Sequence, residues 1–328
     1  MLEVVYNNGL YLPNLDLWLD AGGARDCCIV SHAHADHIAN HRSIIATPET
    51  ARLFRRRRGA ADVEILRFGE RRDFGRYGIT LFPAGHCLGA AQVLIEADGE
   101  RLVYTGDFKL RPNLTAGQAE VIPCDTLIME ATFGEPQYRF PPESETAEKL
   151  CAMVARALRE GITPVVLAYA LGKSQEAIEW LLRAGFRLSL HGAIWAVTEI
   201  YRELGVQFSG HYEKYERGNL SGKVLLAPPN CRKQPMITNL PRSFVIMLTG
   251  WAMSLSAAYR YSGVDMLLPL SDHADYDDLM KMALDCGAQR IFTLYGKSKF
   301  ASRLNEMGLN AVSLDTLPAP ANNQLRLF

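Results

Sequence analysis

The sequence predicts an α/β protein made of two differently organised parts, and two observations lead to this fold class. The first part, up to about residue 130, contains many short apolar segments separated by turn residues, which is typical of β-rich structure. From about Ser144 onward, apolar segments alternate with longer segments of helical periodicity. That alternation indicates βαβ units and a largely parallel sheet.

Short strands are predicted throughout the first part. They are Glu3–Tyr6, Leu15–Leu19, Cys27–Val30, Ser43–Ala46, Glu64–Leu66, Ile79–Pro83, Gln92–Glu96, Arg101–Tyr104 and Thr126–Glu130. Asp98-Gly99 lies between two of these apolar segments and predicts a hairpin, because this dipeptide favours tight two-residue turns. Helices are expected directly after the histidine-rich run at residues 31–37 and near Pro48–Arg57.

The second part is predicted to alternate helices and strands, and several of the helices end at glycine. The predicted helices are Glu145–Glu160, Lys173–Ala184, Ala193–Leu204, Tyr276–Cys286 and Lys299–Met307. The predicted strands are Thr163–Tyr169, Val224–Ala227, Phe244–Thr249, Met266–Leu270, Arg290–Leu294 and Ala311–Leu314. The residues after Pro318 are polar and contain proline, so we expect a loose end there.

The composition is that of an ordinary folded protein. The chain has 328 residues, of which 48% are hydrophobic and 22% charged, so one large core or two unequal cores are expected. The net charge of −1 means that any footprint for nucleic acid must be local. The sequence contains no apolar run that predicts a membrane helix and no signal-peptide pattern, and its seven cysteines form no Cys-x-x-Cys pair. These features predict a cytoplasmic protein without a membrane partner.

A run of closely spaced histidines predicts a metal site. Ser31–His37, with the sequence SHAHADH, places three imidazoles and a carboxylate within six positions, directly after the apolar run Cys27–Val30. On extended backbone His32 and His34 point to the same side. Neutral imidazole and carboxylate suit zinc, and manganese and iron less exclusively. The alternative is a set of buried structural histidines, which is costly because so many polar groups would need partners.

Three further stretches place a candidate ligand at the end of a predicted strand beside glycine. The residues are His86 in GHCLGAA, Asp107 in TGD and Asp20 in LWLDAGG. Glycine allows the backbone to turn sharply and to approach other groups closely. Taken singly, an aspartate beside glycine is most often a turn residue, and a histidine is often a buried, hydrogen-bonded one. Taken in their order along the chain, the three become candidates for one site.

This order of motifs resembles the metallo-β-lactamase superfamily: HAHADH at 32–37, GH at 85–86 and TGD at 105–107. Two later motifs, MEATFG at 129–134 and SDHADY at 271–276, resemble the acidic and histidine motifs of the β-CASP nucleases. The resemblance covers roughly residues 10–315. It implies an αββα sandwich with metals at one edge of its sheets and an inserted α/β domain. The implied domains are a metallo-β-lactamase segment at 1–143, a β-CASP insertion at 144–255 and a metallo-β-lactamase return at 256–328.

The resemblance also implies a set of metal ligands. These are His32, His34 and His86 for a first metal, Asp36 and His37 for a second metal, and Asp107 as a bridge between the two.

Other motif residues are implied to support the metals or the reaction. Asp20 would orient a histidine ligand, and Glu130 would orient a metal ligand or the water near the metals. His273 would donate a proton to the leaving oxygen or contact the scissile phosphate. Asp36, Glu130 and His273 are accordingly the predicted catalytic residues.

Tyr295, in TLYG at 293–296, is a departure from part of that family. RNA-processing members have a histidine at this point, and it completes their second metal site. A neutral phenol is a poor zinc ligand because its pKa is about 10. We therefore expect one firm zinc site and a weaker second site, with manganese as an alternative metal. Because Artemis-type DNA nucleases also lack this histidine, the departure favours DNA over RNA.

Within the β-CASP branch, ALGKSQE at 170–176 and TGW at 249–251 resemble the bacterial ligase-associated DNA exonucleases, which are relatives of Artemis and Apollo. This resemblance implies a 5′ to 3′ exonuclease acting on single-stranded DNA or DNA ends in repair, beside an ATP-dependent DNA ligase and a helicase. The alternatives are an RNA-processing nuclease, a small-molecule esterase or lactonase, and a non-catalytic DNA-end-binding partner of the ligase.

Four residues are candidates for substrate binding. Lys173 and Gln175 lie at a predicted helix start, where anions are favoured. Trp251 is a candidate for stacking on a base, and Tyr295 lies beside the predicted metals. The alternatives are a capped helix start for the first two residues and a core position for the tryptophan.

Overall fold

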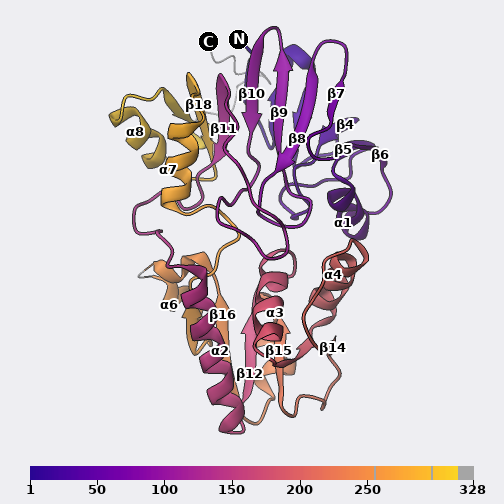
Figure 1. Ribbon diagram of the computed structural model, residues 1–328, viewed down its shortest axis with the longest axis vertical. Helices are drawn as coiled ribbons and strands as arrows, with labels where there is room; N and C mark the ends of the chain where they lie inside the picture. The colour runs from indigo at the N-terminus through magenta and orange to yellow at the C-terminus, as the bar shows by residue number, and fades with distance from the viewer. Residues whose placement is uncertain (255, 297, 317–328) are drawn as a thin grey trace. The chain divides into compact units, whose positions relative to one another are not determined.

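The computed structural model describes residues 1–254, 256–296 and 298–316, and its contacts divide the chain into two compact units (Figure 1). The first unit contains Met1–Glu135 and the described residues from His273 to Thr316, and the second unit contains Pro136–Asp272. In the described part of the chain, no helix is long and apolar enough to span a membrane.

The first unit contains two β-sheets. The first sheet follows chain order, with β1 (Val5–Tyr6), β2 (Leu10–Leu12), β3 (Leu17–Leu19), β4 (Cys27–Ile29), β5 (Ser43–Ala46) and β6 (Asp62–Ile65). The second sheet has the order β19-β18-β11-β10-β9-β8-β7, with β7 (Arg71–Asp73), β8 (Gly78–Pro83), β9 (Ala91–Ala97), β10 (Glu100–Tyr104), β11 (Thr126–Glu130), β18 (Arg290–Leu294) and β19 (Ala311–Ser313). From β7 to β10 the strands are antiparallel, whereas β10, β11, β18 and β19 are parallel.

One apolar core joins the two sheets of the first unit. Alternate side chains of the first sheet, such as Leu10 and Leu12, pack with Val93 and Ile95 of the second sheet, and all four are buried. Each such side chain contributes roughly 1.5–3 kcal/mol by leaving water, so this shared core holds the sheets face to face.

Helices cover the outer faces of this sandwich. α1 (Pro48–Arg58) packs Phe54 against Ile44 and Ala46 of β5. α7 (Tyr276–Asp285) and α8 (Lys299–Glu306) accompany the second sheet, where α8 contacts β18 and β19 (Figure 1). Short 3-10 turns at Pro13–Leu15 and Leu314–Thr316 complete the unit. This αββα arrangement confirms the predicted fold class.

The second unit contains a six-stranded sheet in which every neighbouring pair is parallel. The strands are, in spatial order, β14 (Tyr212–Lys214), β13 (Arg187–Leu190), β15 (Lys223–Ala227), β12 (Thr163–Leu167), β16 (Ser243–Leu248) and β17 (Met266–Leu268). Its α-helices are α2 (Glu143–Arg159), α3 (Lys173–Arg183), α4 (Gly192–Glu203), α5 (Pro235–Thr238) and α6 (Ala257–Arg260), with 3-10 turns at Pro229–Lys233 and Gly250–Met253. Two apolar clusters lie on the two faces of this sheet, so the unit has cores of its own.

The structure differs from the predicted elements in several places. The expected helix after the histidine run is absent from residues 31–42, all of which are described and lie in loops and bends. One reason is that Arg58 binds the carbonyl oxygens of Ala35 and Ile38, which a helix would use for its own hydrogen bonds. Strands β2, β7, β13 and β14 were not anticipated, and the loose end expected after Pro318 lies outside the described residues.

In the sequence, the boundaries between the two units differ from the predicted domain boundaries. Contacts place the divisions after Glu135 and after Asp272, whereas the boundaries were expected after 143 and after 255. The later difference has a clear cause. β17, expected in the returning segment, pairs with β16 as the edge strand of the second unit's sheet.

Candidate metal centre

Strand direction brings the candidate ligands of the second sheet to one edge. β8 and β10 are both antiparallel to β9, and β10 is parallel to β11, so β8, β10 and β11 all end at the same edge. His86 follows β8, Asp107 follows β10, and Glu130 is the last residue of β11. In the first sheet, β3 and β4 are parallel, and Asp20 and His32 follow their ends in the same way.

Imidazole nitrogens converge on one carboxylate at this edge. Nε2 of His32 and Nε2 of His37 each lie 3.4 Å from Oδ2 of Asp107. Nε2 of His86 lies 3.7 Å from the same oxygen and 2.8 Å from Nδ1 of His34. Two ligands of a tetrahedral zinc ion, each about 2.0–2.1 Å from the metal, lie roughly 3.3 Å apart. The spacing therefore suits a metal ion.

We call His32, His34, His86 and Asp107 the metal cluster, because one ligand atom from each lies within 4.8 Å of the others. Two of its atoms support this interpretation. Nε2 of His32 and Oδ1 of Asp107 are buried and make no hydrogen bond. A buried polar atom without a partner costs about 1–3 kcal/mol, and a bound cation would remove that cost for both atoms.

The electrostatics of the cluster favour the forms that bind metal. Burial holds the pKa of His32 well below its usual value, so its imidazole is neutral. Burial alone would raise the pKa of Asp107, but His37 and His273 hold that pKa well below its usual range, so the carboxylate is ionised. Neutral imidazoles with one carboxylate form a donor set that fits zinc. The residues present therefore fit the metal that the motifs imply.

Asp20 holds His37 in place beside the cluster. Its Oδ2 lies 2.9 Å from Nδ1 of His37 and accepts a hydrogen bond of 2.9 Å from the hydroxyl of Tyr104. Its Oδ1 accepts from the backbone N–H of Ser31 at 2.7 Å. Burial opposes a charge on His37, but Asp107 and Asp20 raise the pKa of His37 well above its usual value. Asp20 thus fixes the ring of His37, and its support of a metal ligand stays a prediction.

Tyr104 is a supporting residue that the motifs did not reveal. It precedes the Thr-Gly-Asp motif and is buried at the end of β10. The signal was present in the alternation of β10, because Leu102 and Tyr104 share the face that carries the inner core.

Buried Glu130 and partly exposed His273 form a second pair beside Asp107. Nδ1 of His273 lies 2.9 Å from Oε2 and 3.0 Å from Oε1 of Glu130, and 3.9 Å from Oδ2 of Asp107. The backbone N–H of Phe108 donates to Oε1 of Glu130 at 2.9 Å. Burial raises the pKa of Glu130. The carboxylate thus orients a histidine and also fixes the loop that carries Asp107.

Asp36 is placed differently from the other predicted ligands. Its side chain is 81% exposed, and its Oδ2 lies 3.9 Å from Nε2 of His37. Among the described residues, no set of three ligand atoms close enough to share an ion includes Asp36. Adjacency in the sequence therefore did not bring this carboxylate into the buried cluster in this conformation.

Tyr295 lies beside His37, with 5.5 Å between their ring centroids. Its backbone has a φ of 62°, which is unusual for a residue other than glycine. Asp315 holds this conformation by accepting hydrogen bonds from the N–H groups of Tyr295 and Gly296 at 3.1 and 3.0 Å. Although the residue is 40% exposed, its hydroxyl is bonded to buried Tyr104, and burial raises the pKa of Tyr295 well above its usual value. The phenol therefore stays neutral.

In the second unit, the candidate substrate-binding residues at the helix start are used by the fold. Gln175 is fully buried and bonds to the backbone of Gly172 and Ala170 and to the hydroxyl of Thr198. Nζ of Lys173 is buried and lies 2.9 Å from Oδ1 of Asp272. These contacts agree with the alternative of a capped helix start, and substrate binding by these two residues stays a prediction.

Trp251 is partly buried in the second unit. Its ring packs edge-on against Tyr138, with centroids 5.4 Å apart, and the guanidinium of Arg260 lies 5.2 Å from its centroid. These contacts agree with the alternative of a packed tryptophan, and base stacking stays a prediction.

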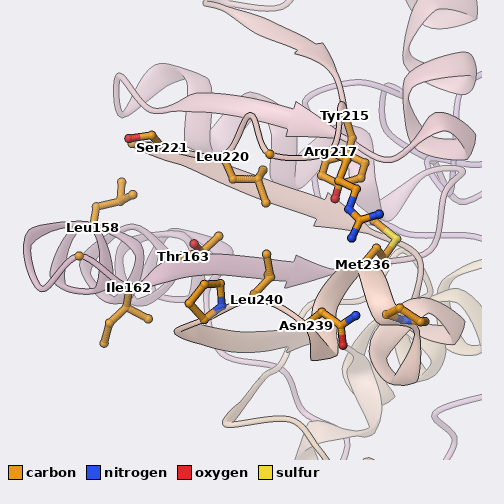
Figure 2. A pocket seen from close by; sticks show the side chains of 15 residues that line it. Leu158, Ile162, Thr163, Tyr215, Arg217, Leu220, Ser221, Met236, Asn239 and Leu240 are labelled. Carbon is orange, nitrogen blue, oxygen red and sulfur yellow. The ribbon is translucent and has the colours of Figure 1, made fainter.

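A pocket of about 810 Å³ lies along one face of the second unit's sheet (Figure 2). Its lining includes Thr163, Tyr215, Arg217, Met236 and Asn239. Open parallel sheets usually bind ligands beyond the carboxyl ends of their strands. This pocket instead extends along the sheet from Thr163 at the start of β12 to Tyr215, which follows the end of β14, and it includes none of the candidate site residues.

Comparison with known proteins decides the family. A family model described as "Beta-lactamase superfamily domain" matches residues 20–185, which is half of the chain. The chain belongs to the metallo-β-lactamase superfamily. This confirms the resemblance found in its motifs, and the relatives described next confirm the β-CASP nuclease branch.

Three proteins with similar sequences are relatives of this superfamily member. A "Probable DNA ligase" of Opitutus terrae is 38% identical over 330 residues, covering 99% of this chain and 32% of that protein. An "RNase J-like protein" of Methanocaldococcus jannaschii is 26% identical over 180 residues, covering 47% of this chain and 43% of that protein. "5' exonuclease Apollo" of Gallus gallus is 28% identical over 193 residues, covering 54% and 42%. The chain thus spans between 32% and 43% of the length of these relatives.

Proposed function

We propose that this protein is a metal-dependent exonuclease that hydrolyses the phosphodiester bonds of DNA, working from the 5′ end. The observation that carries the proposal is the convergence of His32, His37 and His86 on Asp107, with buried ligand atoms that lack hydrogen bonds. The resemblance to a protein named as a 5′ exonuclease and to one named as a DNA ligase supports this substrate and this polarity.

Each residue of the site has a task in this proposal. The metal cluster holds one zinc ion firmly, and that ion supplies Lewis acidity and makes a water molecule more acidic. Asp20 fixes the ring of His37. Glu130 holds the ring of His273 through Nδ1, and His273 gives a proton to the leaving oxygen from Nε2.

We further propose that a second metal binds more weakly than the first. Asp36 is exposed rather than directed into the cluster, and the Tyr295 phenol beside His37 is neutral. The ligand set left for a second ion is accordingly poorer than that of the first site. Manganese is the other metal that this mixture of imidazole and carboxylate can hold.

The second unit is, in this proposal, the β-CASP insertion, and its role is to cover or guide a polymeric substrate. A partnership with an ATP-dependent DNA ligase, in a repair setting that also includes a helicase, is proposed as well. It is supported by the relative named as a DNA ligase, which is about three times as long as this chain.

An RNA nuclease is the second candidate, because one relative is named RNase J-like. Digestion of DNA and RNA of one sequence, labelled at either the 5′ or the 3′ end, separates the two. We expect release of nucleotides from the 5′ end of DNA with zinc or manganese, and none with the Asp107→Ala variant. Cleavage of RNA alone would support the second candidate. If the metal-loaded protein binds DNA ends without cleaving them, the result would support a non-catalytic DNA-end-binding protein.

A further inference from the structure

Two buried cysteines meet in the first unit, at the opposite end of β11 from Glu130. Cys124 lies just before β11, and Cys286 directly follows α7. The backbone N–H of Cys124 donates to the carbonyl oxygen of Cys286 at 3.0 Å. The two residues are 7% and 1% exposed. Neither belongs to the metal cluster or to its supporting residues.

The two thiols also contact each other. The two thiols share a hydrogen bond, which lowers the pKa of Cys286 to about 7 and raises that of Cys124, and the Cys286 thiol also donates to the carbonyl oxygen of Ala283 at 3.6 Å. A thiolate is the nucleophilic form of cysteine, and a lowered pKa favours this form of Cys286 over that of Cys124. Cys28, Cys151 and Cys231 differ, because burial raises the pKa of each of them.

We propose that Cys124 and Cys286 form an oxidation-sensitive dithiol that closes to an intramolecular disulfide in the presence of a small peroxide. The Cys286 thiolate attacks hydrogen peroxide, giving a sulfenic acid and, after proton uptake, one water. The Cys124 sulfur then attacks the sulfenic sulfur, and a second water leaves. In total, two thiols and one peroxide give one disulfide and two waters, so peroxide is the oxidant and the sulfurs are oxidised.

The disulfide would join β11 and α7, the two elements next to Glu130 and His273. Glu130 ends β11, and His273 lies three residues before α7 begins. The Glu130–His273 hydrogen bonds join these elements at one end, and the dithiol joins them at the other. The disulfide would therefore fix α7 to β11 covalently. Because the bridge links positions 124 and 286, the covalent loop would also contain the whole second unit, Pro136–Asp272.

Limited proteolysis after oxidation tests the proposal on the full, zinc-loaded chain. The protein is treated with hydrogen peroxide, its remaining thiols are alkylated, and it is cut by trypsin within residues 136–272. We expect the fragments on the two sides of the cut to stay joined on a non-reducing gel and to separate when the disulfide is reduced. Peptide mapping is expected to identify one cross-linked peptide pair that contains Cys124 and Cys286.

Variants make the result specific. Cys124→Ser and Cys286→Ser should each abolish the cross-link, whereas Cys231→Ser, which changes a buried cysteine of the second unit, should leave it intact. Two findings would overturn the proposal: both thiols alkylated after peroxide treatment, or Cys286 converted to sulfinic acid while Cys124 stays a thiol. DNA cleavage is not a readout here, so failure of the proposed function would leave this test unaffected.

Discussion

The two units both carry polar side chains beyond the carboxyl ends of their strands, but they use them in opposite ways. In the first unit, His32 and Asp107 each have a buried ligand atom that makes no hydrogen bond. In the second unit, Gln175 bonds to three groups of its own unit, and Lys173 is paired with Asp272. Position at a strand end therefore does not identify a site. At these strand ends, the informative property is whether the protein itself satisfies the buried donors and acceptors.

The largest expected effect is that of Asp107→Ala in the first unit. Removing the carboxylate on which the imidazoles converge should abolish stable zinc binding and lower phosphodiester hydrolysis by about 1,000-fold or more. Metal analysis and a nuclease assay measure the two losses. Gln175→Ala is the matched change in the second unit, and it should lower stability while retaining the zinc. Equal zinc contents in the two variants would contradict the assignment of the zinc site to the first unit.

Lys173→Met should lower the free energy of unfolding of the second unit. Asp272 loses its buried cationic partner, which typically costs about 3–5 kcal/mol in the free energy of unfolding, as measured by urea denaturation. Lys281→Met is the control, because its partner Asp285 is 48% exposed and such pairs are worth about 1 kcal/mol or less. The double variant Lys173→Met with Asp272→Asn should recover part of the loss. No recovery would argue against the pair as the cause.

Asp20→Asn should weaken zinc binding without destroying the fold. The amide cannot stabilise His37 as the carboxylate does, and loss of such an orienting group typically lowers metal affinity about 10- to 100-fold. Competition with a zinc chelator measures the change. Asp16→Asn serves as the control, because Asp16 is exposed and bonds to Tyr11. An unchanged affinity in Asp20→Asn would show that Ser31 and Tyr104 suffice to hold the loop.

The smallest expected effect concerns Asp278 in α7. Burial raises the pKa of Asp278 to about 6, and its Oδ2 is buried without a hydrogen bond. Because the folded state binds this proton more tightly than the unfolded state, the group lowers stability as pH rises from about 4 to 6. Asp278→Asn should stabilise the protein by about 1–2 kcal/mol at pH 7, after allowance for solvent screening, and hardly at pH 4.

Urea denaturation of wild type and variant at both pH values measures this difference. Asp285→Asn, at the other end of α7, should leave the pH dependence unchanged. A stabilisation of Asp278→Asn that is equal at the two pH values would contradict the assigned titration.

The sequence was most informative where a local pattern and the tertiary environment agree. β5, β11 and β18 have the predicted bounds, since their apolar residues face buried surroundings on both sides of the strand. β7 was missed because Arg-Arg-Asp has no strand pattern, and its pairing with β8 is what makes it a strand. β14 was also missed because Tyr-Glu-Lys has no strand pattern, and its pairing with β13 makes it a strand.

For the site, residue types at strand ends predicted candidate metal ligands, but the hydrogen-bond partners of these residues depend on contacts across the fold. His86 and Asp107 could be selected because each follows a strand beside glycine. The exposure of Asp36 and the internal bonding of Gln175 follow from side-chain conformations that spacing along the chain does not specify. Tyr104 supports Asp20 from a position 84 residues later, a relation that only the folded chain creates.

The Glu130–His273 pair also has a consequence for how the chain folds. The two residues are 143 positions apart, so joining them across an unfolded segment would carry a large entropic cost of loop closure. The second unit lies between them and has apolar cores of its own, so its folding shortens the effective loop before the pair forms. During synthesis, His273 leaves the ribosome after the entire second unit. The Glu130–His273 pair is therefore completed late, after the second unit has been made.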